Sequence, residues 1–253
     1  MAKVIAVANQ KGGVGKTTTS INLSSCTAYR GKRLLLIDLD PQGNATTGLG
    51  IDKRKMTSSI YDVLINEISL KDTSLKTMQE TLTLCPSSIS LAGAEIELVS
   101  LLSRENRLKY AISEVQDDYD YIFIDCPPSL GLLTLNALTA ADTVLVPIQC
   151  EYFALEGLSQ LMDTVKLVQK HLNRSLKVEG VVLTMFDART NLSIEVADEV
   201  RKHFTNKVYQ TLIPRNVRLS EAPSYGLPII LYDKNSKGAE AYLQLADELI
   251  NVK

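Results

Sequence analysis

A glycine-rich segment near the N-terminus carries the residue types that bind phosphate. Residues 11–18 read Lys-Gly-Gly-Val-Gly-Lys-Thr-Thr and follow a short apolar run. Glycines let a backbone approach an anion closely, and N–H groups at the start of the next helix complete an anion cradle. In such a loop, Lys16 bridges the β- and γ-phosphates of a nucleotide, and the Thr17 hydroxyl ligates Mg²⁺. The residues predicted to bind the nucleotide are Lys11, Gly12, Gly13, Val14, Gly15, Lys16, Thr17 and Thr18.

This loop differs from the general phosphate-loop pattern at its start. Gln10 stands where that pattern has a glycine, and Lys11 adds a second lysine. Both changes match a variant of the pattern, K-G-G-x-G-K-T. The alternative is a glycine-rich turn that binds nothing. Because the loop combines glycines and two lysines between an apolar run and a helix-length segment, nucleotide binding is the stronger prediction.

Three aspartates follow apolar runs and therefore fall at the ends of predicted strands. Asp38 and Asp40 follow Leu34–Ile37, and Asp125 follows Tyr121–Ile124. A carboxylate beside a phosphate loop can hold Mg²⁺ through water. Asp125 is the stronger candidate for this role, and Asp38 is the second. Asp40 lies further along its loop, so we expect it to position or deprotonate the attacking water. The alternative is that these aspartates only cap turns.

The rest of the chain alternates short apolar runs with longer mixed segments. Short, unbroken apolar runs rich in β-branched residues are typical of strands buried on both faces. The predicted strands are Val4–Ala8, Leu34–Ile37, Tyr121–Ile124, Thr143–Ile148, Val178–Met185 and Val208–Ile213. The predicted helices are Thr17–Tyr29, Ser103–Val115, Ala154–His171, Leu192–His203 and Lys237–Val252. This alternation predicts an α/β fold, a doubly wound, mostly parallel sheet flanked by helices, with the ligand at the carboxyl ends of the strands.

Residues 43–84 form the most polar and least periodic stretch. We predict switch-like loops there, with one short helix near Ile60–Ile65. No internal repeat, low-complexity segment or shift in composition divides the chain. Residues 1–253 are therefore predicted to form a single P-loop domain.

The composition limits the classes of function. Of the 253 residues, 27 are Lys or Arg and 29 are Asp or Glu, so the net charge is −2. A protein that coats nucleic acid through bulk charge is strongly basic, so DNA binding here needs a local patch or an oligomer that gathers one. The cysteines lack CxxC spacing and predict free, buried thiols. The sequence shows no signal peptide and no apolar run of membrane-spanning length, which predicts a soluble, cytoplasmic protein.

Longer motifs resemble those of a known family. KGGVGKTTT, DLDPQGNAT and DCPPSLGLLTLNAL are similar to motifs of the ParA/MinD group of deviant Walker ATPases. VLVPIQCEYFALEGLSQL, VVLTMFDARTN and IPRNVRLSEAPSYGLPIILYD are similar to those of chromosomal ParA proteins, and the resemblance covers residues 3–248. It implies a single α/β domain that binds ATP and Mg²⁺ and forms a homodimer, face to face around two ATP molecules. It also implies that Lys11 reaches the partner's nucleotide, and that Pro214 and Asn216 contact adenine.

The same resemblance implies macromolecular partners and a location on the nucleoid in the cytoplasm. In this family the ATP-bound dimer binds double-stranded DNA without sequence preference, and a ParB-type centromere-binding protein stimulates hydrolysis and release. Arg189 and Arg218 match family positions that contact DNA, and Arg215 lies close to Arg218 in the sequence. Dimerisation would double these cations on one face, which reconciles DNA binding with a net charge of −2. The alternative is that these arginines form ordinary surface ion pairs.

Three other functions each require a feature that this sequence lacks. A membrane-surface ATPase of the MinD type would carry a basic amphipathic C-terminal helix, whereas the tail here holds two acids and one lysine, and Tyr242, Leu245 and Leu249 form a core-facing stripe. A redox protein like the nitrogenase iron protein would need cysteines with cluster-ligand spacing. A plasmid-type ParA with an N-terminal helix-turn-helix module would need more than the ten residues that precede Lys11, whereas a short plasmid partition ATPase without that module stays an alternative.

Overall fold

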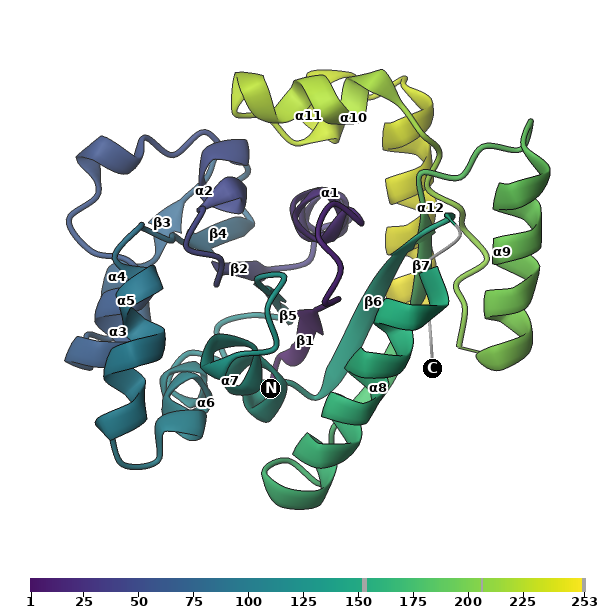
Figure 1. Cartoon of the computed structure of the whole chain (residues 1–253). Helices are drawn as coiled ribbons and strands as arrows, with labels where there is room; N and C mark the ends of the chain where they lie inside the picture. Colours follow the sequence, from purple (N-terminus) through teal and green to yellow (C-terminus); the bar gives the residue numbers. More distant parts are fainter. Residues whose placement is uncertain (152–153, 206, 252–253) are drawn as a thin grey trace.

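A computed structural model describes residues 1–151, 154–205 and 207–251. Across these residues, seven strands form one sheet (Figure 1). The strands are β1 (Lys3–Val7), β2 (Leu34–Asp38), β3 (Leu75–Lys76), β4 (Leu82–Cys85), β5 (Tyr121–Asp125), β6 (Thr143–Gln149) and β7 (Lys177–Thr184). Their order is β3-β4-β2-β5-β1-β6-β7, and only β3 pairs antiparallel with its neighbour. The predicted fold class, a mostly parallel, doubly wound α/β sheet, is confirmed.

Helices cover both faces of this sheet. The α-helices are α1 (Lys16–Tyr29), α2 (Asn44–Gly48), α3 (Ile60–Asn66), α4 (Leu70–Thr73), α5 (Leu91–Glu97), α6 (Arg107–Ser113), α7 (Leu132–Ala140), α8 (Ala154–His171), α9 (Asn191–His203), α10 (Val217–Glu221), α11 (Ile229–Tyr232) and α12 (Lys237–Asn251). Short 3-10 turns are η1 (Lys53–Lys55), η2 (Leu98–Ser100), η3 (Arg104–Asn106) and η4 (Ala222–Tyr225). The predicted helices before residue 30 and after residue 150 are all present, although Val252 lies outside the described residues, as do Tyr152 and Phe153 of the quoted motif.

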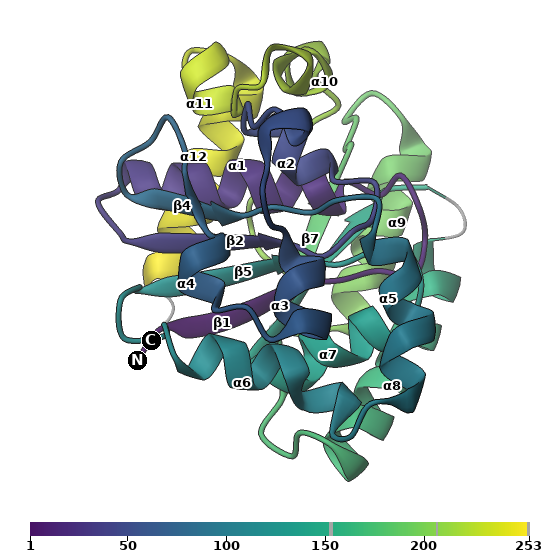
Figure 2. The same cartoon turned by 90° about the vertical axis from the view of Figure 1, so that its left-hand side faces the viewer.

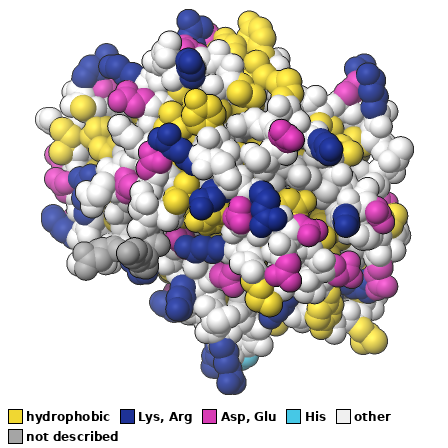
Figure 3. All heavy atoms as spheres, turned by 180° about the vertical axis from the view of Figure 1, so that it is seen from behind, with side chains coloured by type: hydrophobic (Ala, Val, Ile, Leu, Met, Phe, Trp, Pro, Cys, Tyr) yellow, Lys and Arg dark blue, Asp and Glu magenta, His cyan; other side chains and the backbone are white. Residues whose placement is uncertain are grey.

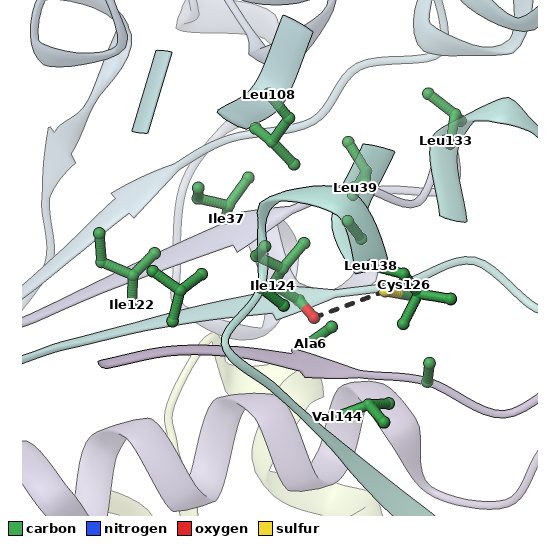
Figure 4. Close-up of a cluster of buried hydrophobic side chains, with 14 of the residues drawn as sticks. Ala6, Ile37, Leu39, Leu108, Ile122, Ile124, Cys126, Leu133, Leu138 and Val144 are labelled. Carbon is green, nitrogen blue, oxygen red and sulfur yellow. Dashed lines mark hydrogen bonds between the residues drawn. The ribbon is translucent and has the colours of Figure 1, made fainter. Parts of the chain in front are cut away.

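Alternate residues of the strands face two separate hydrophobic layers. Ala6 and Ile124 belong to the layer under α3 and α5 to α9, where Cys126 also packs (Figure 4). Ile5 and Phe123 point to the opposite layer, which is covered by α1, α2 and α10 to α12. Figure 2 shows the sheet between these two sets of helices. Burial on both faces explains why the central strands are continuously apolar, and it leaves the carboxyl edge of the sheet as the place for polar groups.

The C-terminal helix α12 is part of the core. Tyr242, Leu245 and Leu249 are buried, as predicted. The Tyr242 hydroxyl and the Thr19 hydroxyl of α1 form a hydrogen bond (3.1 Å). The apolar face of α12 is therefore used inside the molecule, against α1.

The prediction that Val208–Ile213 forms a strand is wrong. This segment runs beside β7, but in the described part of the chain it makes only isolated bridges to that edge. The backbone N–H groups of Gln210 and Thr211 donate instead to the Glu248 carboxylate on α12 (2.9 and 2.7 Å). Because these donors are taken by a side chain, the strand ladder cannot continue.

The prediction for residues 43–84 is only partly right. The helix expected near Ile60–Ile65 is present as α3, but α2, α4, β3 and β4 were not predicted. β4 has only four residues and shows no pattern of its own, and it is a strand because β2 supplies a parallel partner. α7 was also missed, and the helix predicted as Ser103–Val115 is split into η3 and the shorter α6.

Two further predictions concern buried and apolar groups. All four cysteines are free and buried, as predicted. Among the residues that the structure describes, no helix combines the length and the apolar character needed to cross a bilayer.

Candidate nucleotide site and arginine surface

The glycine-rich loop joins β1 to α1 at the carboxyl edge of the sheet. Gly13 and Gly15 have φ angles of 75° and 89°, a left-handed conformation that a Cβ disfavours. Between them, the Val14 carbonyl accepts a hydrogen bond from the Thr184 hydroxyl at the end of β7 (2.8 Å). Two glycine conformations and one hydrogen bond from the end of β7 therefore set the shape of the loop.

The start of α1 presents N–H groups to this loop. Thr19 N–H donates to the Gly15 carbonyl (2.8 Å), whereas the N–H groups of Lys16, Thr17 and Thr18 have no backbone acceptor among the described residues. Such N–H groups carry partial positive charge at a helix N-terminus. The first turn of α1 contains no acidic residue. The arrangement suits an anion such as a phosphate group.

The two lysines of the loop have different environments. Lys16 is buried, and its Nζ donates to the Lys11 carbonyl (3.1 Å). Burial lowers the pKa of Lys16, and the negative charges of Asp125 and Asp40 oppose this effect. A bound phosphate would favour the charged form in the same way. Lys11 is partly exposed, and its Nζ lies 3.9 Å from Glu151 Oε2.

Asp125 is fully buried beside the loop. Its Oδ1 accepts a hydrogen bond from the Ser20 hydroxyl (2.8 Å), while its Oδ2 has no hydrogen-bond partner in the part of the chain that is described. Burial, and next the charge of Asp38, raises the pKa of Asp125 to about 8, and the Thr17 and Ser20 hydroxyls oppose the rise. A cation, or water bound to one, would satisfy the open oxygen. The residues present therefore fit Mg²⁺ beside Thr17.

Asp38 is the second candidate metal ligand, and both of its carboxylate oxygens accept hydrogen bonds from other groups of the protein. Its Oδ2 accepts hydrogen bonds from the Thr46 N–H and hydroxyl groups of α2 (both 2.7 Å), and its Oδ1 accepts one from Asp40 N–H (3.3 Å). Burial raises the pKa of Asp38 to about 6. The described residues contain no group of three or more His, Cys, Asp or Glu side chains placed to hold a metal ion. Mg²⁺ is often bound through few carboxylates and the phosphates of a nucleotide.

Asp40 lies in the loop after β2. Its side chain is largely buried, and its Oδ1 accepts a hydrogen bond from Gln42 N–H (2.9 Å). Its charge acts on both Lys16 and Asp125, which places it in the same cluster as the glycine-rich loop. The structure thus brings the three predicted aspartates together at one edge of the sheet.

Pro214 and Asn216 line a cavity of about 480 Å³ next to the loop. Gly15 and Thr18 form the wall shared with the phosphate loop. Met185, which has a positive φ of 51°, lines it from the end of β7. The side chain of Asn216 also caps α10. The cavity and the loop are continuous, so one ligand can occupy both.

Arg189 and Arg215 lie on two loops that are joined by backbone hydrogen bonds between Phe186 and the segment around Pro214. The Arg189 guanidinium makes two hydrogen bonds to Asp187 (2.9 and 2.7 Å) and holds the pKa of that carboxyl at about 2. The charge of Arg215 lowers the same pKa, so both arginines share one acidic neighbour.

The other ion pairs of these arginines also involve nearby carboxylates. Arg215 lies 3.7 Å from Glu151, the residue that also faces the phosphate loop. Arg218, at the start of α10, lies 2.9 Å from Glu221. The side chains of Arg189, Arg215 and Arg218 are 88%, 66% and 53% exposed. All three arginines are exposed, and each has an acidic partner.

The face of the molecule opposite the carboxyl edge of the sheet carries charges of both signs. In Figure 3, Lys and Arg side chains are scattered among Asp and Glu side chains over the face drawn. This face has no broad area of one sign, so it offers less to a polyanion than a cluster of arginines does.

Four residues of this region were not predicted from the sequence. Ser20 could have been found, because it follows Lys16 by four residues and so lies on the same side of α1. Thr184, Asn9 and Glu151 show no motif that predicts their contacts with the loop. Their positions depend on the pairing of β6 with β1 and of β7 with β6.

Comparisons with known proteins agree with this architecture. A family model described as an AAA domain matches residues 2–178. Over 249 residues the chain is 64% identical to the sporulation initiation inhibitor protein Soj of Bacillus subtilis, with 98% of each chain covered. It is 54% identical over 250 residues to the chromosome partitioning protein ParA of Myxococcus xanthus, covering 99% of this chain and 88% of that protein. The chain belongs to the ParA/Soj family of partitioning ATPases.

A solved structure of the same fold contains a nucleotide. It is described as cobyrinic acid a,c-diamide synthase from Mycobacterium smegmatis with bound ADP and magnesium. That chain is 42% identical to this ParA/Soj-family chain, with a TM-score of 0.87 and coverage of 99% and 94% of the two chains. Identity is higher to the partitioning proteins, so partitioning is the function that we carry forward. The family resemblance predicted from the motifs is confirmed.

Proposed function

We propose that this protein is a partitioning ATPase that uses ATP and Mg²⁺ and works as a single P-loop domain. An ATP-bound sandwich dimer would bind double-stranded DNA without sequence preference, and a ParB-type partner would stimulate hydrolysis and release. The observation that carries the proposal is the two-lysine glycine loop beside buried Asp125, whose Oδ2 has no partner among the described residues. Its place of action would be the cytoplasm, on the nucleoid.

The residues of the site have distinct proposed roles. The N–H groups of the loop and the Lys16 ammonium hold the nucleotide phosphates. Thr17 and Asp125 hold Mg²⁺, which when bound neutralises charge on those phosphates. Asp40 orients the attacking water, and Lys11 reaches across the dimer to stabilise charge on the phosphoryl group in transfer.

The remaining predicted residues have supporting roles in the proposal. Asp38 holds the Asp40 loop through its hydrogen bonds rather than being a direct metal ligand. Pro214 and Asn216 bind adenine in the cavity beside the loop. The cavity joins the loop directly, which supports one nucleotide spanning both.

Arg189, Arg215 and Arg218 form the proposed DNA surface. One subunit offers few cations there, and each has an acidic partner. Pairing two subunits doubles the number of cations on one face, and binding of a polyanion rises steeply with the number of phosphates contacted. ATP would therefore control DNA binding by assembling the surface.

The alternative, a MinD-like ATPase positioned on a membrane, finds less support. Its C-terminal helix would have to be available to lipid, whereas the apolar face of α12 is buried against α1 through Tyr242, Leu245 and Leu249. The acidic residues of α12 would also repel anionic lipid.

The test is ATP hydrolysis by the wild-type protein alone, with DNA, and with DNA plus a ParB-type protein. We expect slow hydrolysis alone, acceleration by DNA and partner together, and no activity in Lys16→Ala. Hydrolysis that is unaffected by DNA and partner, or flotation of the ATP form with anionic liposomes, would reject the partitioning mechanism.

A further inference from the structure

Asn9 is a buried polar residue that none of the roles above uses. It lies between β1 and the phosphate loop, with 3% of its surface exposed. Its Nδ2 donates to the Pro147 carbonyl of β6 (2.8 Å), and its Oδ1 accepts from Lys11 N–H (3.0 Å). One side chain therefore ties the first lysine of the loop to the neighbouring strand.

Hydrogen bonds hold both the backbone N–H and the backbone carbonyl of Lys11. Asn9 binds its N–H group, and the Lys16 ammonium donates to its carbonyl (3.1 Å). A phosphate would compete with this carbonyl for Lys16, because an anion is the stronger acceptor for an ammonium. Once Lys16 turns to phosphate, the bond from Asn9 still fixes the Lys11 backbone, and no other hydrogen bond to that backbone is present in the described part of the chain.

Among the residues that the structure describes, no other contact substitutes for this bond. Lys11 is partly exposed, and its ammonium lies 3.9 Å from Glu151, a separation at which an exposed ion pair contributes little. The start of α8 passes close by at Gly157, where an added Cβ would stand 3.4 Å from Asn9 Oδ1 and 3.6 Å from Lys11 Cβ. These are ordinary van der Waals distances, so the start of α8 lies directly beside both residues.

The geometry points to Asn9 as the positioning residue for Lys11, acting through the Lys11 backbone on the step in which two ATP-bound subunits close. This inference rests on the proposed role of Lys11 across the dimer. Asn9 touches none of the N–H groups of α1 and makes no hydrogen bond to Lys16. Its loss should therefore spare ATP binding by the single subunit and weaken dimer closure and hydrolysis.

Asn9→Ala is the test variant, and Asn173→Ala is its matched control. Asn173 is also buried, and its Nδ2 donates to the Leu138, Thr139 and Ala141 carbonyls (3.1, 3.2 and 2.7 Å). It precedes β7, at the opposite edge of the sheet from the nucleotide site. Both variants remove a buried amide, so they share the cost to stability.

Three properties are measured for each variant: the melting temperature, the affinity for a fluorescent ATP analogue, and the amount of dimer formed with a non-hydrolysable ATP analogue. We expect Asn9→Ala to keep nucleotide affinity within about threefold and to lower the dimer association constant by about tenfold, since a lost hydrogen bond to an ordered group is worth about that factor. Asn173→Ala should lower only the melting temperature. If Asn9→Ala does not fold, Asn9→Ser carries the same test.

The double variant Asn9→Ala/Lys11→Ala separates this inference from the proposed function. If Asn9 acts through Lys11, the double variant should dimerise as poorly as Lys11→Ala alone. Additive losses, or an Asn9→Ala variant that dimerises like Asn173→Ala, would overturn the inference while leaving the role of Lys11 intact. Normal dimerisation of Lys11→Ala would instead overturn the proposed function.

Discussion

The carboxyl edge of the sheet that carries the phosphate loop, called here the nucleotide edge, differs in construction from the arginine surface of Arg189, Arg215 and Arg218. At the nucleotide edge, Lys16, Asp38 and Asp125 are buried and bonded to the backbone or to hydroxyl groups. On the arginine surface, Arg189 and Arg218 are exposed and face carboxylates that lie within three residues of them. The first region is held by the core of the fold, and the second is held by exposed ion pairs.

This difference predicts different responses to change. A buried charge depends on its few partners, so removing one leaves an uncompensated group at large cost. An exposed pair is screened by salt and contributes little to stability. The nucleotide edge should therefore respond to single substitutions sharply, and the arginine surface should respond gradually and with strong dependence on salt.

Lys16→Ala should have the largest effect. It removes the buried ammonium that faces the loop, and loss of a buried charged partner typically costs several kcal/mol, so we expect at least about a 100-fold loss of ATP affinity. Titration with a fluorescent ATP analogue measures this. A loss of affinity below tenfold would contradict the assignment of buried Lys16 as the lysine that binds the phosphates.

Asp40→Ala should come next, with hydrolysis reduced by about 100-fold or more, the range for loss of a general base. ATP binding should persist, because Asp40 bonds to Gln42 N–H rather than to the glycine loop. Single-turnover hydrolysis and DNA retention with ATP measure the two effects. The variant should stay on DNA as an ATP dimer; normal turnover would show that another group positions the water.

Gly12→Val should separate binding from dimerisation. Apart from its two chain neighbours, none of the described residues has an atom within 4 Å of a Cβ added at Gly12, so we expect ATP affinity to change by less than about threefold. A second subunit placed against the loop would meet the new side chain, so the ATP dimer should be lost. Analytical ultracentrifugation with an ATP analogue decides this, and a normal dimer would contradict the face-to-face arrangement.

The buried carboxylates of Asp38 and Asp125 should make the free energy of unfolding depend on pH, and this effect is smaller than those above. The pKa values of Asp38 and Asp125 are raised to about 6 and about 8. Between the ordinary aspartate pKa of 3.8 and these raised values, the native state binds more protons than the unfolded state. The free energy of unfolding should therefore fall as the pH rises from about 4 to 8. Asp125→Asn should flatten this fall. Urea denaturation without Mg²⁺ or nucleotide checks it, and parallel pH curves for both proteins would refute the shift.

The nucleotide site was largely predictable from the sequence because its chemistry is local. The glycine loop needs left-handed residues at Gly13 and Gly15, and a helix must follow it, so spacing alone locates it. Asp38 and Asp125 are the last residues of β2 and β5 and pair in register, because parallel strands bring their carboxyl ends to one edge. Five of the six predicted strands are present, because each is a continuous apolar run that is buried on both faces. The predicted helices are also present, except that Ser103–Val115 is divided into η3 and α6.

The parts that were missed depend on contacts between distant segments. Val208–Ile213 has a strand pattern, but Glu248 takes its backbone donors. β4 has too few residues for a pattern and exists through its pairing with β2. Asn9 has no motif, and its bond to Pro147 appears only when β6 lies beside β1. Such side-chain contacts with the backbone are set by tertiary structure, which the local pattern does not contain.

The most direct test of the account is DNA binding by the wild-type protein and by Arg189→Glu/Arg218→Glu, each with ATP, ADP or no nucleotide, at two salt concentrations. We predict that the wild type binds DNA only with ATP and loses affinity steeply as salt rises, since each phosphate contact adds about 0.9 to the logarithmic salt slope. The double variant should keep ATP-dependent dimerisation and lose this binding. Equal binding in all nucleotide states, or ATP-dependent binding that survives in the double variant, would contradict a DNA surface assembled by ATP.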